Sequence, residues 1–134
     1  PNFARISVET AEFNYIQRNR ISGSAGAGIS LSYFDFAQSG ANFNLLRGNL
    51  ITQSTKVGIG VNGGKGNRIV SNSLVNNSYN GYDSGINNQW DDGKQGNYWS
   101  DYKGKDANVD GIGDTPYPVA PNGVDNYPLM KPSD

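Results

Sequence analysis

The chain has 134 residues, enough for one domain but too few for two independent cores. It contains no Cys and no His, which excludes disulfides, thiolate nucleophiles, Cys/His zinc sites and a Ser-His-Asp triad. Gly and Asn each occur 18 times, so we expect a turn-rich β protein. The net charge is −1 and 17% of the residues are charged, and we expect neither nucleic-acid binding nor membrane insertion.

A repeat occupies the first part of the chain. The segments that begin at Asn14, Asn44 and Asn67 share the pattern N-x-(I/L)-x-x-N-x-(I/L), with offsets of 30 and 23 residues. A Gly-containing block follows each of them at a constant distance, and the seven extra residues of the longer offset fall in an insertion at about residues 32–41. A step this short, rich in Gly and Asn, is unsuited to helical repeats. It predicts an all-β parallel solenoid of about four coils over residues 1–86.

Three stacks of inward side chains follow from these offsets, with members one coil apart. The predicted stacks are Ile16 with Leu46 and Ile69, Ile21 with Ile51 and Leu74, and Ile6 with Ile29, Ile59 and Tyr82.

One corner of the solenoid holds Asn at the same place in three coils. Asn19, Asn49 and Asn72 align there, and we expect their amides to form a hydrogen-bonded ladder. The alternative is that Asn recurs only because it is a good turn residue.

The N-terminal end of the solenoid lacks a visible cap. Open ends expose strand edges and a slice of core, so we expect this end to contact further β-helix coils or a neighbouring subunit. Head-to-tail stacking of open coils would give a filament. The insertion contains Tyr33, Phe34 and Phe36, which either form an exposed contact patch or fold over their own coil.

Residues 87–134 form the expected C-terminal cap, and residues 81–134 carry a net charge of −5 against +4 for residues 1–80. The cap contains Trp90 and Trp99. Their rings either plug the end of the core or provide an exposed platform for sugar rings.

A second motif of the cap has the pattern D-x-N-x-D-G-x-x-D over residues 106–114. Alternate residues of such a tight loop point inward and place hard oxygen atoms around one small volume, which predicts a Ca²⁺ site. The bidentate Glu usual at position 12 is absent, so we expect weak affinity, on the order of micromolar to millimolar. The alternatives are Mg²⁺ or a metal-free turn. The predicted ligands are Asp106, Asn108, Asp110, the carbonyl of Ile112, and Asp114.

The segment N-Y-W-S-D-Y…D-G-I-G-D-T-P-Y, residues 97–117, together with the Asn repeat resembles secreted right-handed parallel β-helix proteins of the NosD and pectate-lyase-like type. The resemblance covers residues 4–130 and implies a right-handed parallel β-helix located outside the cell or at its surface. It leaves the activity open, because this repeat occurs in lyases, hydrolases, binding modules and structural proteins. Without His or Cys, and with Met130 as the one Met, the chain offers no soft ligand set for the copper associated with NosD-type proteins.

Three functions agree with these residues. The favoured one is a non-catalytic extracellular structural or adhesive module, stabilised by Ca²⁺ and assembling end to end with other coils or subunits. The second is a carbohydrate-binding module that uses Trp90 and Trp99. The third is a polysaccharide lyase or hydrolase, but no two acids occupy matched repeat positions, and no catalytic residue is assigned. Its candidates would be Asp83, Asp91 and Asp92 with Arg47 or Arg68.

Overall fold

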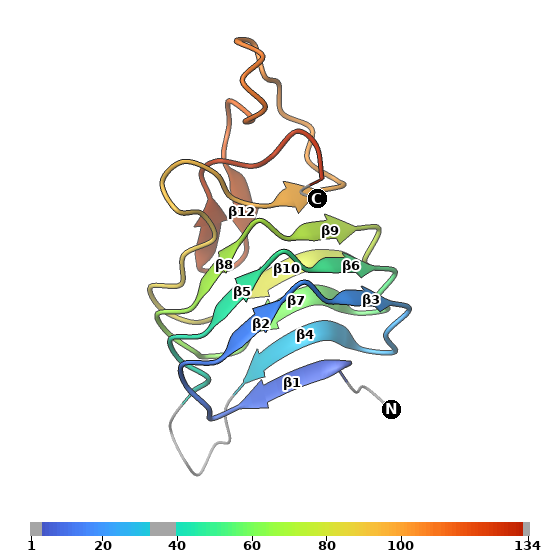
Figure 1. Cartoon of the computed structure of the whole chain (residues 1–134), viewed down its shortest axis with the longest axis vertical. Helices are drawn as coiled ribbons and strands as arrows, with labels where there is room; N and C mark the ends of the chain where they lie inside the picture. The colour runs from blue at the N-terminus through green and yellow to red at the C-terminus, as the bar shows by residue number, and fades with distance from the viewer. Residues whose placement is uncertain (1–3, 33–39, 133–134) are drawn as a thin grey trace.

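The computed structural model describes residues 4–32 and 40–132. These residues form thirteen short strands, with no helix among them, and the strands wind upward as stacked coils beneath a C-terminal segment (Figure 1). The predicted parallel β-helix is confirmed. Within the described part of the chain, no helix has the length and apolarity needed to cross a membrane.

Three parallel sheets form the sides of the coils. Sheet 1 has the order β1 (Ile6–Glu9), β4 (Ala27–Ser32), β7 (Val57–Val61), β10 (Tyr79–Asp83). Sheet 2 has the order β2 (Tyr15–Gln17), β5 (Leu45–Arg47), β8 (Arg68–Val70). Sheet 3 has the order β3 (Arg20–Ser22), β6 (Leu50–Thr52), β9 (Ser73–Val75), β11 (Tyr98–Trp99). An antiparallel hairpin of β12 (Tyr117–Val119) and β13 (Gly123–Asp125) belongs to the C-terminal segment.

Two of the three predicted stacks of apolar side chains are present in the core as expected. In sheet 2, Leu46 pairs with Ile16 on one side and Ile69 on the other. In sheet 3, Ile51 likewise pairs with Ile21 and Leu74. Side chains on alternate residues of a strand point to opposite faces, so one inward residue per coil suffices to build each stack.

The third predicted stack is wrong at its last member. Gly81, not Tyr82, pairs with Ile59, and Tyr82 pairs with Gly60. The step between these coils is therefore one residue shorter than expected, and a slip of one residue moves a side chain to the opposite face. Tyr82 consequently lies on the outside, where it is 40% exposed.

Two ladders of Asn side chains run along the corners of the coils. In the expected ladder, Asn19, Asn49 and Asn72 are joined by Nδ2–Oδ1 hydrogen bonds of 2.9 to 3.0 Å, and the ladder continues to Asn97. A second ladder at the corner before sheet 2 has bonds of 2.9 to 3.1 Å. Its members are Asn14, Asn44, Asn67 and Asn88. Each amide thus connects one coil to the next.

Coil stacking extends beyond residue 86, the boundary expected from the sequence. Gln89 bridges to Arg68, and β11 pairs with β9, so the last coil ends at Trp99. Trp90 and Trp99 are both buried, with ring centroids 5.7 Å apart. Together with Val119 of the hairpin they close this end of the core.

Two buried aspartates hold the cap in place. Asp83 accepts hydrogen bonds from the Nε1 of Trp90, the backbone N–H of Gly85 and the amide of Asn88. Asp125 accepts hydrogen bonds from the Nε1 of Trp99 and from the backbone N–H groups of Asn97 and Tyr127. Burial raises the pKa of the Asp125 carboxyl to about 6, although these three bonds act in the opposite direction.

Candidate ligand-binding groove

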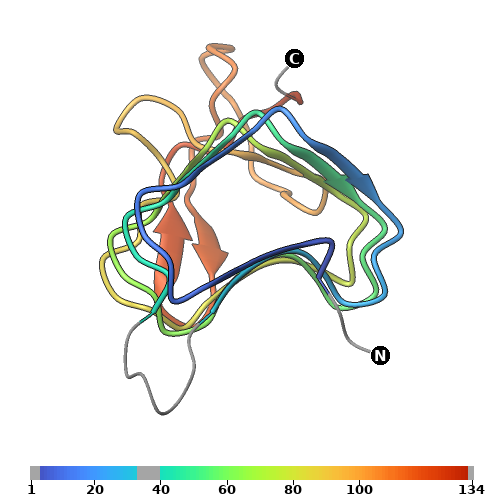
Figure 2. The same cartoon turned by 60° about the horizontal axis from the view of Figure 1, so that its bottom comes forward.

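Two glycines bend the strands of sheet 1. A Cβ on Gly28 would lie 2.8 Å from the carbonyl oxygen of Gly58, and one on Gly58 would lie 2.7 Å from the carbonyl oxygen of Asn80. Only glycine fits this close approach of successive coils. The residues that follow them, Ile29 and Ile59, are also fully buried. Two consecutive inward positions interrupt the alternation of the strand, and the side that sheet 1 forms is indented (Figure 2).

Two columns of outward residues flank this indentation. One column has Ala27, Val57 and Tyr79 in register, and the other has Ser30, Gly60 and Tyr82. The hollow between them has a volume of about 760 Å³ and ends against the tip of the hairpin. Its lining consists of Ala27, Ser30, Thr55, Lys56, Val57, Gly60, Asn62, Tyr79, Gly81, Tyr82, Ala120 and Pro121. We call it the sheet 1 groove.

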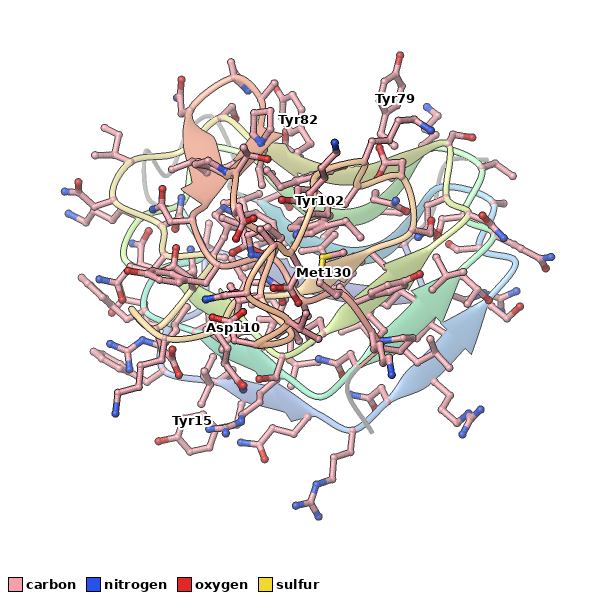
Figure 3. All side chains as sticks on the ribbon, turned by 90° about the horizontal axis from the view of Figure 1, so that it is seen from above. Tyr15, Tyr79, Tyr82, Tyr102, Asp110 and Met130 are labelled. Carbon is pink, nitrogen blue, oxygen red and sulfur yellow. The ribbon has the colours of Figure 1, made fainter. Side chains whose placement is uncertain are left out.

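The sheet 1 groove combines small apolar side chains with exposed aromatic rings. Tyr79 is 74% exposed and Tyr82 is 40% exposed. Both lie on the same side of the molecule, opposite Tyr15 (Figure 3). Lys56 is the one charged residue of the lining. The groove is therefore suited to an uncharged ligand that stacks on ring faces and forms hydrogen bonds at the rim.

The residues predicted for sugar or partner contact lie elsewhere. Of the two alternatives for Trp90 and Trp99, the sugar platform is wrong, because both rings pack inside the cap and are 0% and 1% exposed. Tyr33, Phe34 and Phe36 lie outside the described residues. The sequence analysis did not identify the tyrosines of the sheet 1 groove, because the repeat offset placed Tyr82 in the core. The Gly-containing block gave no signal of the shorter step, since Gly81 precedes Tyr82 as Gly58 precedes Ile59; only the strand register shows it.

The acids considered for catalysis stabilise turns or the cap. Asp91 accepts the backbone N–H groups of Gly93 and Asn126. Asp92 accepts those of Lys94 and Gln95, and chiefly the Gln95 bond lowers the pKa of its carboxyl. Asp91 and Asp92 line a hollow of about 460 Å³ together with Arg68. Arg47 lines a different hollow, and Asp83 is buried, so the five candidates do not share one site.

The loop of residues 106–114 folds around its own amides. Asp106 accepts the backbone N–H groups of Asp110 and Gly111, at 3.1 and 2.8 Å. Asp110 accepts that of Ile112 at 2.9 Å and the side-chain amide of Asn108 at 3.2 Å.

At the other end of the loop, Asp114 accepts the backbone N–H of Ala107 at 2.8 Å. Each of the three carboxylates thus accepts at least one backbone N–H, whereas the sequence analysis expected all three to bind one cation. The groups that would bind a metal ion do not converge: residues 4–32 and 40–132 contain no cluster of three or more His, Cys, Asp or Glu side chains arranged to hold one.

The stacked parallel coils and the inward Asn ladders place this chain among the parallel β-helix proteins. A family profile described as "Periplasmic copper-binding protein (NosD)" matches residues 2–104, and the chain belongs to this family.

Two curated relatives carry the name "Probable ABC transporter binding protein NosD". The protein of Pseudomonas aeruginosa is 34% identical over 117 residues, which cover 78% of this chain and 27% of the relative. That of Stutzerimonas stutzeri is 33% identical over 123 residues, which cover 87% of this chain and 27% of the relative. The chain thus spans about a quarter of the length of these relatives. No solved structure gives a significant match.

The predicted Ca²⁺ site is wrong. The description of the family names copper and not calcium. The carboxylates of the loop accept hydrogen bonds from amide groups and do not converge on one point. Copper does not fit these residues either, because the chain has neither His nor Cys and Met130 is its one thioether. Seen from above in Figure 3, Met130 and Asp110 both lie over the coils, in the C-terminal segment. We assign no metal chemistry to this chain.

Proposed function

We propose that this chain is a non-catalytic structural module of the cell envelope that docks further parallel β-helix coils on its open end. The observation that carries the proposal is the difference between the two ends of the coil stack. β1, β2 and β3 form the first coil, and within residues 4–32 and 40–132 each has a strand neighbour on one side only. The cap covers the opposite end.

The core is least covered at the open end. Ile16 and Ile21 of the first coil are each 8% exposed, whereas Leu46 and Ile51 directly above them are 0% exposed. Unpaired strand edges readily accept another strand. A further coil would pair with the free backbone groups and complete the burial of this layer. The greater length of the curated relatives supports this proposal.

The cap restricts how two copies can meet. Head-to-tail stacking needs two open ends, and Trp90, Trp99 and the hairpin block one of them. Two copies that meet through their first coils form a closed dimer with twofold symmetry. The proposal therefore replaces the filament expected from head-to-tail stacking with association at the open end alone.

Light scattering after size-exclusion chromatography tests this proposal. We expect the chain to dimerise as its concentration rises. Val8→Lys places a charge against the open core and should keep the protein monomeric, whereas Ser7→Lys adds the same charge on the outward face of the same strand and should dimerise. A wild type that is monomeric at every concentration would contradict the proposal.

A second candidate function, glycan binding, is favoured by the sheet 1 groove. Tyr79 and Tyr82 offer two ring faces beside a floor of small side chains, and neutral sugars stack on such rings. We propose a neutral oligosaccharide as the ligand.

Affinity electrophoresis in gels that contain soluble neutral polysaccharides tests this second function. We expect retardation that is lost in Tyr79→Ala and Tyr82→Ala. Tyr15→Ala is the matched control, because Tyr15 is 75% exposed on the opposite side. Equal loss of retardation in Tyr15→Ala, or no retardation of the wild type, would argue against glycan binding in this groove.

A further inference from the structure

A different hollow lies at the corner between sheets 2 and 3, and both of its charged residues are arginines. It has a volume of about 410 Å³ and contains no carboxylate in its lining. The lining consists of Gln17, Arg18, Leu45, Arg47, Gly48, Ser71 and Gln95. We call it the arginine hollow.

The coil brings together two cations that are far apart in the sequence. Arg47 ends β5, and Arg18 is the first residue after β2 in the coil below. The backbone N–H of Arg18 donates to the carbonyl oxygen of Arg47 at 3.1 Å. The two side chains therefore leave the backbone from adjacent points of successive coils and line the same hollow.

The turn at this corner makes room beside Arg18. Arg18 has a φ of 58°, in the left-handed region that long side chains seldom adopt, and the matching positions of the next two coils are Gly48 with 71° and Ser71 with 60°. A Cβ on Gly48 would lie 3.6 Å from the Cγ of Arg18, so the Arg18 stem lies along this glycine. The hollow therefore forms because the small residues Gly48 and Ser71 follow the long side chain of Arg18 at this corner of successive coils.

Hydrogen-bond donors in the arginine hollow are available to a ligand. Among residues 4–32 and 40–132, neither the Arg18 nor the Arg47 guanidinium has a hydrogen bond or ion pair. Gln95 donates through Nε2 to the Oγ of Ser71 at 2.7 Å, which leaves the Ser71 hydroxyl proton free to donate. Asp92 lies outside the lining and accepts two backbone N–H groups in its own turn, and the positive charge of Arg47 also helps to lower the pKa of its carboxyl.

We propose that the arginine hollow binds a phosphate group, with the forks of Arg18 and Arg47 on its oxygens and the Ser71 hydroxyl as a third donor. Guanidinium groups bind phosphate through paired N–H donors. A phosphate group suits two forks from different coils and a hydroxyl donor better than a carboxylate does, because it offers more acceptor oxygens. The phosphate is either inorganic or part of a lipid headgroup, and these sources are distinguishable.

A titration with inorganic phosphate at constant ionic strength, followed by amide chemical shifts, tests the site. We expect saturable shifts at Gly48 and Ser71, and about tenfold weaker binding in Arg18→Gln and in Arg47→Gln. Arg68→Gln is the matched control, because Arg68 lies on the next coil, outside this hollow, and bonds to Gln89. Equal weakening in Arg68→Gln would show only diffuse attraction and overturn the site, as would shifts that do not saturate.

Sedimentation with vesicles identifies the source of the phosphate. Vesicles of phosphatidylcholine with phosphatidylglycerol are compared with vesicles of phosphatidylcholine alone. Sedimentation that requires phosphatidylglycerol and is lost in Arg47→Gln assigns a lipid headgroup. Saturable binding of inorganic phosphate without sedimentation assigns the free anion. Failure of both assays rejects the proposal.

Discussion

The indole Nε1 of Trp99 donates a hydrogen bond of 2.8 Å to Oδ2 of Asp125, and the same oxygen accepts the backbone N–H of Asn97 at 2.7 Å. Asn97 is the last rung of the ladder that begins at Asn19, so hydrogen bonds connect the first coil to the cap. The second ladder ends in the same way, because its last rung, Asn88, donates to Asp83, which also accepts the indole of Trp90. Each ladder thus ends on a buried aspartate that holds a tryptophan.

This arrangement predicts that the indole donors stabilise the cap. Trp99→Phe keeps an aromatic ring but leaves Asp125 with one hydrogen bond fewer, and we expect the free energy of unfolding to fall by about 1–3 kcal/mol. Trp90→Phe should have a similar effect through Asp83. Urea denaturation measures both, with Tyr127→Phe, at an exposed position, as the control. Equal stability of all three variants would show that the two links contribute nothing.

The Asp125 carboxyl predicts a pH dependence of stability. Its pKa is raised to about 6 in the folded protein from an ordinary value of 3.8, chiefly by burial. The folded state therefore binds this proton more tightly than the unfolded state does. The contribution of this group is present below about pH 4 and is lost as the pH rises through 6.

Thermal melts of the wild type and Asp125→Asn between pH 4 and 7 isolate this contribution. The wild type should lose melting temperature relative to the variant as the pH rises. A difference between the two proteins that stays constant over this range would mean that the carboxyl does not titrate there.

The Asn ladder predicts a large cost for removing one rung. The Asn49 side chain accepts from the backbone N–H and the amide of Asn19 and donates to the carbonyl of Ile16 and to Asn72. Asn49→Ala leaves these buried and half-buried groups without partners, and we expect the free energy of unfolding to fall by more than about 2 kcal/mol in urea denaturation. Asn62→Ala, at an exposed position, should change stability little. A small effect at Asn49 would show that the ladder adds little to stability.

The bend of sheet 1 predicts that Gly58 and Gly60 tolerate a methyl group differently. A Cβ on Gly58 would lie 2.9 Å from the Cδ1 of Leu74, inside the core, whereas one on Gly60 would point outward, 3.2 Å from the Cγ1 of Val57. We expect Gly58→Ala to cost about 1–3 kcal/mol and Gly60→Ala to cost less. Guanidinium denaturation of the two variants tests the difference, and equal costs would contradict the bend.

Sequence alone determined the coil and most of its core. Ile16, Leu46 and Ile69 stack because strand alternation and a constant residue step place their side chains at the same point of each turn. The Asn repeat likewise predicted which residues share a corner. The family resemblance followed from the same residues, because these patterns are local and recur along the chain.

Tertiary structure alone decided which surfaces are available and what each charge contacts. Tyr82 lies outside because one coil is one residue shorter, and Arg18 meets Arg47 only because the coil brings them together. The carboxylates of Asp106 and Asp110 accept backbone N–H groups, a choice that depends on how the chain turns and not on the spacing of its acids. Burial, pairing and close approach arise between segments distant in sequence, so no local pattern encodes them.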